Sequence, residues 1–172
     1  MVGRARGLLA KWSTNTSNIA GDGPTQMKLR GSYPAKVDEK GRLKIPVSFL
    51  DGLKEYGEQF YVTSFTGESA RIYPLKVWSE IEDKLAKLPS TNKAKQKFLL
   101  LTSYFGQVVE MDAQGRLLMP AVLREKAHTV GDVAVLGALD YLEVVNDAKA
   151  IDQIEKAPMT DEDYKELGDL GV

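Results

Sequence analysis

The sequence contains no cysteine, only one histidine and no run of 18 apolar residues. Without cysteine, the chain has no disulfide, no thiolate nucleophile and no Cys-ligated zinc, and its composition fits a reducing, cytoplasmic compartment. Without a long apolar run, we expect no membrane-spanning helix. The net charge at pH 7 is −1, so no overall positive charge draws the chain to nucleic acid.

Sequence motifs that carry catalysis are also missing. The single histidine, His128, falls on a predicted short helix, where a structural role fits better than a catalytic one. The chain has no Gly-x-Ser-x-Gly elbow, no Gly-x-x-x-x-Gly-Lys-Ser/Thr phosphate loop and no glycine-rich turn for a dinucleotide. The acidic residues 161–163 fit a solvated helix start better than a cation site. We therefore predict no enzymatic activity, no cofactor and no bound metal.

Charge is spread unevenly along the chain. Residues 28–48 carry six basic and two acidic side chains, whereas residues 140–172 carry ten acidic side chains and three lysines. This distribution predicts either a local anion-binding face or two differently charged solvated surfaces. Residues 1–26 are rich in polar and helix-breaking residues and are expected to form a disordered extension. We expect residues 158–172 to form an acidic tail, with Thr160 as the N-cap of a last helical turn.

A segment of the sequence occurs twice. Residues 37–46 match residues 111–120 at an offset of 74, with Asp, Gly, Arg, Leu and Pro identical at equivalent places. The match continues with Gly-Glu at 57–58 and Gly-Asp at 131–132. Two tandem copies of one unit are therefore predicted.

Each copy is predicted to fold as strand, tight turn, strand, short helix, strand, strand and helix, a ββαββα unit. The first repeat spans 27–88 and the second 103–157, with a linking helix over 89–102. The opening strand is expected to begin at Ser32 in the first repeat and at Tyr104 in the second. Trp78 falls on the apolar face of a predicted helix and is expected in the core.

The repeated turn supplies the candidate site residues. Asp38 and Asp112 open the two turns, because a carboxylate can accept backbone N–H bonds there. Gly41 and Gly115 supply the positive φ that a bulged hairpin loop needs.

Each turn also carries an arginine, Arg42 or Arg116, and the arginine fork suits phosphate oxygens or a guanine edge. The first loop has Lys40 and Lys44 nearby, while the second has Gln114 and a leucine at those places. The candidate DNA-binding residues are therefore these two arginines with Lys40, Lys44 and Gln114. A purely structural interpretation remains open, in which each aspartate pairs with the arginine of its own loop.

Residues 27–33, followed by the turn at 38–46, closely resemble the opening of the MraZ family of bacterial regulators. Residues 112–120 resemble the second Asp-x-x-x-Arg signature of that family. The resemblance covers about residues 27–157 and is specific, because both signatures are followed by Leu, a variable residue, an apolar residue and Pro, and then by a predicted short helix.

The resemblance implies an AbrB-like (SpoVT-AbrB) fold of the α+β, mainly β class, in which two swapped hairpins form a double-split β-barrel with peripheral helices. It implies closed homo-oligomeric rings that bind direct repeats in promoter DNA ahead of the division and cell-wall gene cluster, usually as repressors, at the nucleoid in the cytoplasm. It assigns DNA contact to Arg42 and Arg116, and turn shaping to Asp38 and Asp112.

Two other classes of function remain open. One is an AbrB-like antitoxin, although such proteins usually carry one copy of the turn and a long toxin-binding tail. The other is an enzyme, which would need a catalytic set that the sequence does not reveal. A neighbouring toxin gene would favour the antitoxin, and neighbouring cell-wall genes would favour the regulator.

Overall fold

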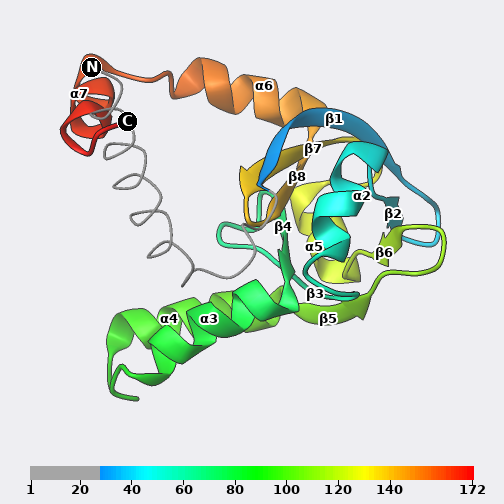
Figure 1. Ribbon diagram of the computed structural model, residues 1–172, viewed down its shortest axis with the longest axis horizontal. Helices are drawn as coiled ribbons and strands as arrows, with labels where there is room; N and C mark the ends of the chain where they lie inside the picture. Colours follow the sequence, from blue (N-terminus) through cyan, green and yellow to red (C-terminus); the bar gives the residue numbers. More distant parts are fainter. Residues whose placement is uncertain (1–27) are drawn as a thin grey trace, which may run out of the picture.

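The computed structural model describes residues 28–172, so the predicted disorder of residues 1–26 lies outside the described residues. Eight strands form one antiparallel sheet in the order β5-β3-β4-β8-β7-β1-β2-β6. The sheet curls into a nearly closed barrel (Figure 1). Its strands are β1 (Leu29–Val37), β2 (Arg42–Lys44), β3 (Gln59–Thr63), β4 (Ala70–Pro74), β5 (Gln107–Glu110), β6 (Arg116–Leu118), β7 (Gly131–Leu139) and β8 (Leu142–Asn146).

Six helices lie among the described residues. Two short ones cap the barrel, and the other four project from its far side, away from the β1–β2 and β5–β6 loops (Figure 1). None of these helices is long and apolar enough to cross a membrane. They are α2 (Val47–Lys54), α3 (Leu75–Ala86), α4 (Lys93–Tyr104), α5 (Ala121–Ala127), α6 (Asp147–Lys156) and α7 (Asp161–Asp169).

The two repeats interlock rather than fold side by side. β3 of the first repeat pairs with β5 of the second, and β7 of the second pairs with β1 of the first. The short second strands, β2 and β6, pair with each other. This exchange of hairpins is the predicted double-split barrel, and the fold prediction is confirmed.

A pseudo-two-fold axis relates the repeats. In the β2–β6 pair, Leu43 lies opposite Leu117, and these residues are equivalent at the offset of 74. In the β4–β8 pair, Ile72 lies opposite Leu142, which are equivalent after the shorter loop of the second repeat. Each pair therefore sits on the axis, one at each side of the barrel.

The main core fills the barrel between these two pairs. It combines side chains of both repeats, and the largest fully buried ones lie in β2, β3, β4, β6, β7, β8, α2 and α5 or directly after β2 and β6. Because each repeat contributes to one shared core, neither could bury its apolar face alone. These side chains are Phe49, Phe60, Leu43, Ile45, Leu53, Ile72, Leu117, Met119, Leu123, Leu142, Val62 and Val135.

Two strand boundaries differ from those expected. β1 begins at Leu29 rather than Ser32, because it pairs with β7 over nine residues and this long-range ladder extends both strands. Tyr104 does not open a strand but ends α4. The hydroxyls of Tyr61 and Thr63 both donate to the carbonyl of Thr102, at 3.0 and 2.7 Å, and fix that end of α4 against β3.

The helices outside the barrel have their own packing. α3 and α4 cover an aromatic cluster in which Trp78 is 3% exposed and stacks on Tyr61, so its predicted core position is confirmed. α4 occupies most of the segment of the predicted linking helix. At the C-terminal end, Thr160 caps α7, as the sequence indicated, but α7 has nine residues rather than a single turn, and Asp163 completes a capping box with Thr160.

Candidate nucleic-acid interface

The two repeated turns are near-identical hairpin loops. In the first, the backbone N–H of Asp38 donates to the carbonyl of Arg42 at 2.9 Å; in the second, Asp112 donates to Arg116 at 3.0 Å. The left-handed φ angles of Gly41 (82°) and Gly115 (71°) allow each chain to turn back. The turn-shaping positions are therefore where the sequence placed them.

Each aspartate holds its loop through both carboxylate oxygens. Oδ1 of Asp38 accepts from the backbone N–H of Lys40 at 3.0 Å and of Arg42 at 2.8 Å, and Oδ2 accepts from Nε of Arg42 at 2.8 Å. Asp112 repeats all three bonds with Gln114 and Arg116 at 2.9, 3.0 and 2.8 Å. The structural pairing left open by the sequence is thus present in both loops.

This pairing leaves the outer part of each arginine available. The aspartate engages only Nε, and among the described residues no hydrogen bond is made by the Nη atoms of Arg42 or Arg116. The two side chains are 32% and 26% exposed. A guanidinium held at Nε with free Nη groups is oriented to donate two hydrogen bonds to a phosphate or a guanine edge. Pairing and binding are therefore compatible.

The same hydrogen bonds shift the acidity of the aspartates. The backbone N–H of Arg42 is the largest influence on the pKa of Asp38 and lowers it below its ordinary 3.8, against the opposing effect of desolvation. Desolvation is the largest influence on the pKa of Asp112 and raises it, but the bonds from Arg116 and Gln114 together lower the pKa.

These shifts predict that both loops keep their hydrogen bonds down to about pH 4. A carboxylate with a lowered folded pKa contributes stability above its unfolded pKa, and that contribution is lost as the pH falls through the folded value. We expect the Nε–H proton signals of Arg42 and Arg116, followed by NMR, to change only below pH 3.8. An Asp38→Asn variant should abolish the Arg42 transition and leave that of Arg116 unchanged. A midpoint above 3.8 in the parent protein would contradict the lowered pKa values.

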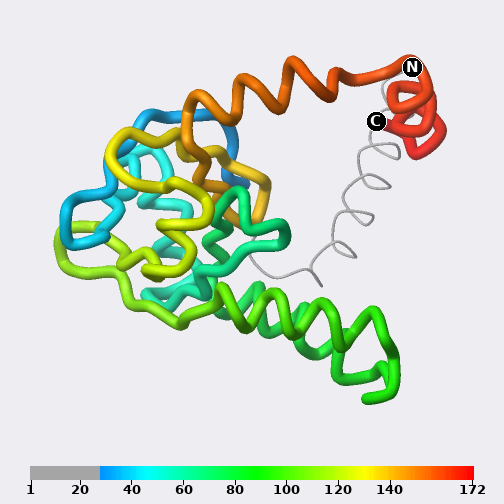
Figure 2. Tube along the Cα trace, turned by 180° about the vertical axis from the view of Figure 1, so that it is seen from behind, coloured from blue at the N-terminus to red at the C-terminus, as the bar shows by residue number. Residues whose placement is uncertain are grey.

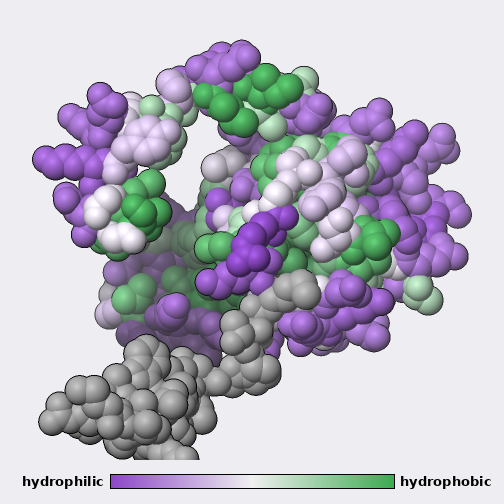
Figure 3. Space-filling view, turned by 45° about the horizontal axis from the view of Figure 1, so that its top comes forward, coloured by the Kyte–Doolittle hydropathy of each residue, from purple (hydrophilic) through white to green (hydrophobic). Residues whose placement is uncertain are grey.

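The loops lie side by side at one end of the barrel. The backbone N–H of Ile45 donates to the carbonyl of Gly115 at 3.0 Å, and that of Met119 donates to Gly41 at 2.8 Å. Opposite views show the β1–β2 and β5–β6 loops next to each other (Figures 1 and 2). Hydrophilic side chains gather at the same end (right in Figure 3). The fold thus brings Arg42 and Arg116 to one polar end of the molecule.

The structure adds a contact for one predicted basic residue. The Nζ of Lys44, which lies two residues after Arg42 in β2, donates to the carbonyl of Gln114 in the second loop. The reason is the antiparallel β2–β6 pair, which places Lys44 opposite Arg116. Lys40 and Gln114 are exposed at the tips of their own loops. Basic charge is therefore shared more evenly between the loops than the sequence order indicated.

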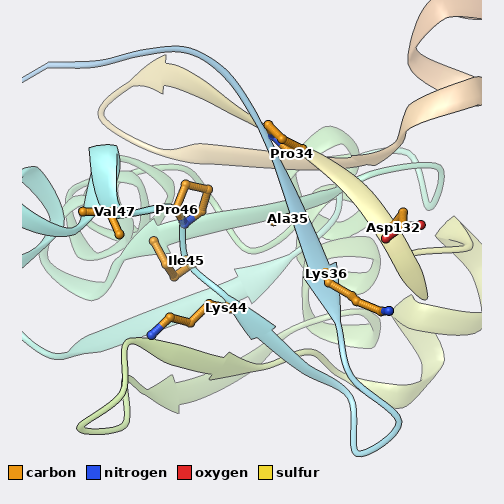
Figure 4. Close-up of a pocket in the computed structure, with 8 residues that line it drawn as sticks. All are labelled: Pro34, Ala35, Lys36, Lys44, Ile45, Pro46, Val47 and Asp132. Carbon is orange, nitrogen blue, oxygen red and sulfur yellow. The ribbon is translucent and has the colours of Figure 1, made fainter.

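Lys44 also borders a hollow of about 430 Å³ beside the first loop (Figure 4). The hollow exists because β1 and β2 pair only at Val37 and Leu43 and then diverge. Its lining includes Ile45 and Pro46, and the side chains of Lys36 and Lys44 point away from each other at its edge. The lining is mostly apolar, and Asp132 is its one acidic member beside the two lysines.

Sequence reasoning missed one cation at this end of the barrel. Arg124 of α5 lies directly against Gly41 of the first loop. Alignment of the two repeats could have identified Arg124. At the offset of 74 it is equivalent to Leu50, so a charged residue in the second repeat replaces an apolar residue in the first.

Comparisons with known proteins agree with this architecture. A family model described as "MraZ protein, putative antitoxin-like" matches residues 29–101 and 106–166. A protein of Acidobacterium capsulatum named "Transcriptional regulator MraZ" is 51% identical over 145 residues, covering 84% of this chain and 99% of that protein. A protein of the same name from Koribacter versatilis is 50% identical over 146 residues, again covering 84% of this chain and 99% of that protein. The chain therefore belongs to the MraZ family.

Proposed function

We propose that this protein is a sequence-specific DNA-binding regulator of transcription that contacts DNA through its two arginine loops. The observation that carries this proposal is the pair of adjacent loops in which aspartate holds Nε of the arginine and leaves its Nη groups free. Arginines presented in this way fit phosphate oxygens and guanine edges. The printed names of the relatives, transcriptional regulators, support the same function, and we propose no enzymatic role.

We further propose that several copies act together. The described part of one chain presents two such loops, and the chain carries a net charge of −1, so a single copy would bind DNA weakly. In a closed homo-oligomeric ring, binding of one loop raises the effective concentration of the next. Direct repeats spaced to match adjacent subunits would then supply selectivity. On the resemblance to the family, the target is the promoter ahead of the division and cell-wall gene cluster, the effect is repression, and the site of action is the nucleoid in the cytoplasm.

A titration of the protein against the DNA upstream of its own gene tests the proposal. We expect Arg42→Ala to weaken binding by roughly fivefold or more, because a bidentate arginine contact is worth about 1–3 kcal/mol. The logarithm of the parent's binding constant should fall with the logarithm of salt concentration by about 0.9 for each phosphate neutralised.

Arg30→Ala is the matched control, because Arg30 is exposed and lies near the opposite end of β1 from the loop. It should bind DNA as the parent does. An Arg42→Ala protein with parental affinity, or an affinity that does not respond to salt, would refute the proposal.

An antitoxin is the second candidate, because the matching family model carries the words "putative antitoxin-like". The gene neighbourhood and co-purification with a neighbouring gene product distinguish the two. The antitoxin would be favoured if the protein formed a stable complex with a toxic product of a neighbouring gene and if that complex no longer bound DNA.

A further inference from the structure

We propose that Arg124 is a third DNA-contacting arginine, supplied to the first loop by the other repeat. This inference rests on the proposed DNA-binding function and adds a phosphate-binding residue to it. Neither the repeated turn nor the Asp-x-x-x-Arg signature includes Arg124, which lies in α5, beyond the second loop.

The position of Arg124 is defined by contact with the first loop. A Cβ atom placed on Gly41 would come within 2.5 Å of Cζ and 2.7 Å of Nε of Arg124, so the guanidinium occupies the space that a side chain at residue 41 would need. Gly41 is buried as a result. Gly41 directly precedes Arg42, so Arg124 and Arg42 both lie at the first loop.

Hydrogen bonds hold this guanidinium in place. Nε of Arg124 donates to the carbonyl of Met119 at 3.1 Å, and the N–H of Met119 donates to the carbonyl of Gly41 at 2.8 Å. The described residues provide no hydrogen-bond acceptor for the Nη atoms of Arg124, which is only partly buried. Like Arg42, it is therefore fixed at Nε and free to donate at Nη.

The pseudo-two-fold axis provides a comparison for Arg124 at the second loop. At the equivalent place in the second loop, Leu50 packs against Gly115, with its Cδ2 3.1 Å from where a Cβ would lie. An apolar side chain is thus sufficient to cover the glycine. The second loop instead receives its extra cation from Lys44, through the carbonyl of Gln114. Each loop therefore has one positive charge from the opposite repeat: Arg124 at the first loop and Lys44 at the second.

The charge balance of the first loop favours an anion, because Lys40, Arg42 and Arg124 outnumber the carboxylates of Asp38 and Glu39. Asp38 is paired with Arg42, while the described residues pair no carboxylate with Arg124. A phosphate oxygen bound at the first loop can accept hydrogen bonds from the free Nη groups of Arg42 and of Arg124, because Arg124 lies against Gly41, the residue before Arg42. Backbone phosphates of DNA are the anions that the proposed function supplies.

The test compares Arg124→Leu with Arg124→Lys in the full-length protein. The leucine variant copies the arrangement of the second loop, so it should keep the parental circular dichroism and oligomeric size. We expect its DNA affinity to fall by roughly tenfold near 0.1 M salt, and its salt slope to drop by about 0.9 for each first loop that engages DNA. The lysine variant should keep the parental slope, because it retains the charge.

The salt slope separates charge from packing. An Arg124→Leu protein that folds and assembles normally but keeps the parental slope would overturn the inference, whatever its affinity, because no phosphate contact would have been lost. Failure of the proposed function appears differently, as an Arg42→Ala protein with unchanged DNA affinity. Loss in Arg42→Ala together with an unchanged slope in Arg124→Leu would leave the function standing and refute the role of Arg124.

Discussion

Replacing Leu43 by alanine is expected to lower the free energy of unfolding by about 2–5 kcal/mol. Leu43 is fully buried and lies on the pseudo-two-fold axis, opposite Leu117 in the β2–β6 pair. Truncation leaves a cavity in the shared core beside two strands of only three residues each. Urea unfolding followed by circular dichroism measures the change.

Val47→Ala is the matched control for this prediction. Val47 starts α2 only four residues later but is 78% exposed, so its truncation should change the free energy of unfolding by less than about 0.5 kcal/mol. If Leu43→Ala lowered the free energy of unfolding no more than Val47→Ala does, the β2–β6 pair would not contribute to the stability of the shared core. Because both arginine loops leave from the ends of this pair, its stability also bears on the site.

Local sequence signals were sufficient for the loops and for several helix features. Asp and Gly at fixed places in a turn act within four residues, so the hydrogen bonds of both loops could be predicted from the chain alone. The Thr160 cap and the core position of Trp78 follow from equally short-range rules. The boundaries predicted for the repeats and the linking helix stay predictions.

Features that depend on contact between the repeats could not be read in this way. The nine-residue pairing of β1 with β7 joins segments about a hundred positions apart, and no local pattern sets its length. The contact of Lys44 with the second loop could not be predicted either, because it depends on the register of the β2–β6 pair. Arg124 reaches Gly41 only because the hairpins are exchanged. The barrel itself was anticipated through the family resemblance rather than from periodicity.

The exchanged hairpins change the expected balance between the two arginines. By sequence order, Arg42 has two lysines nearby and Arg116 has none, which predicts one strong and one weak loop. With Lys44 at the second loop and Arg124 at the first, each arginine has at least one cation from the other repeat. We therefore expect Arg116→Ala to weaken DNA binding by an amount within about tenfold of the effect of Arg42→Ala.

The double variant Arg42→Ala/Arg116→Ala should lose most of the preference for the gene's own upstream DNA over unrelated DNA. Two bidentate contacts at about 1–3 kcal/mol each correspond to a loss of at least about 30-fold for one subunit, and more when several subunits engage. Competition titrations with specific and unrelated duplexes measure this ratio. The parental circular dichroism spectrum must be retained, since both arginines also bond to their aspartates. A folded double variant that keeps the parental ratio would mean that these arginines only close their own turns, and the recognition of DNA would have to be sought elsewhere on the barrel.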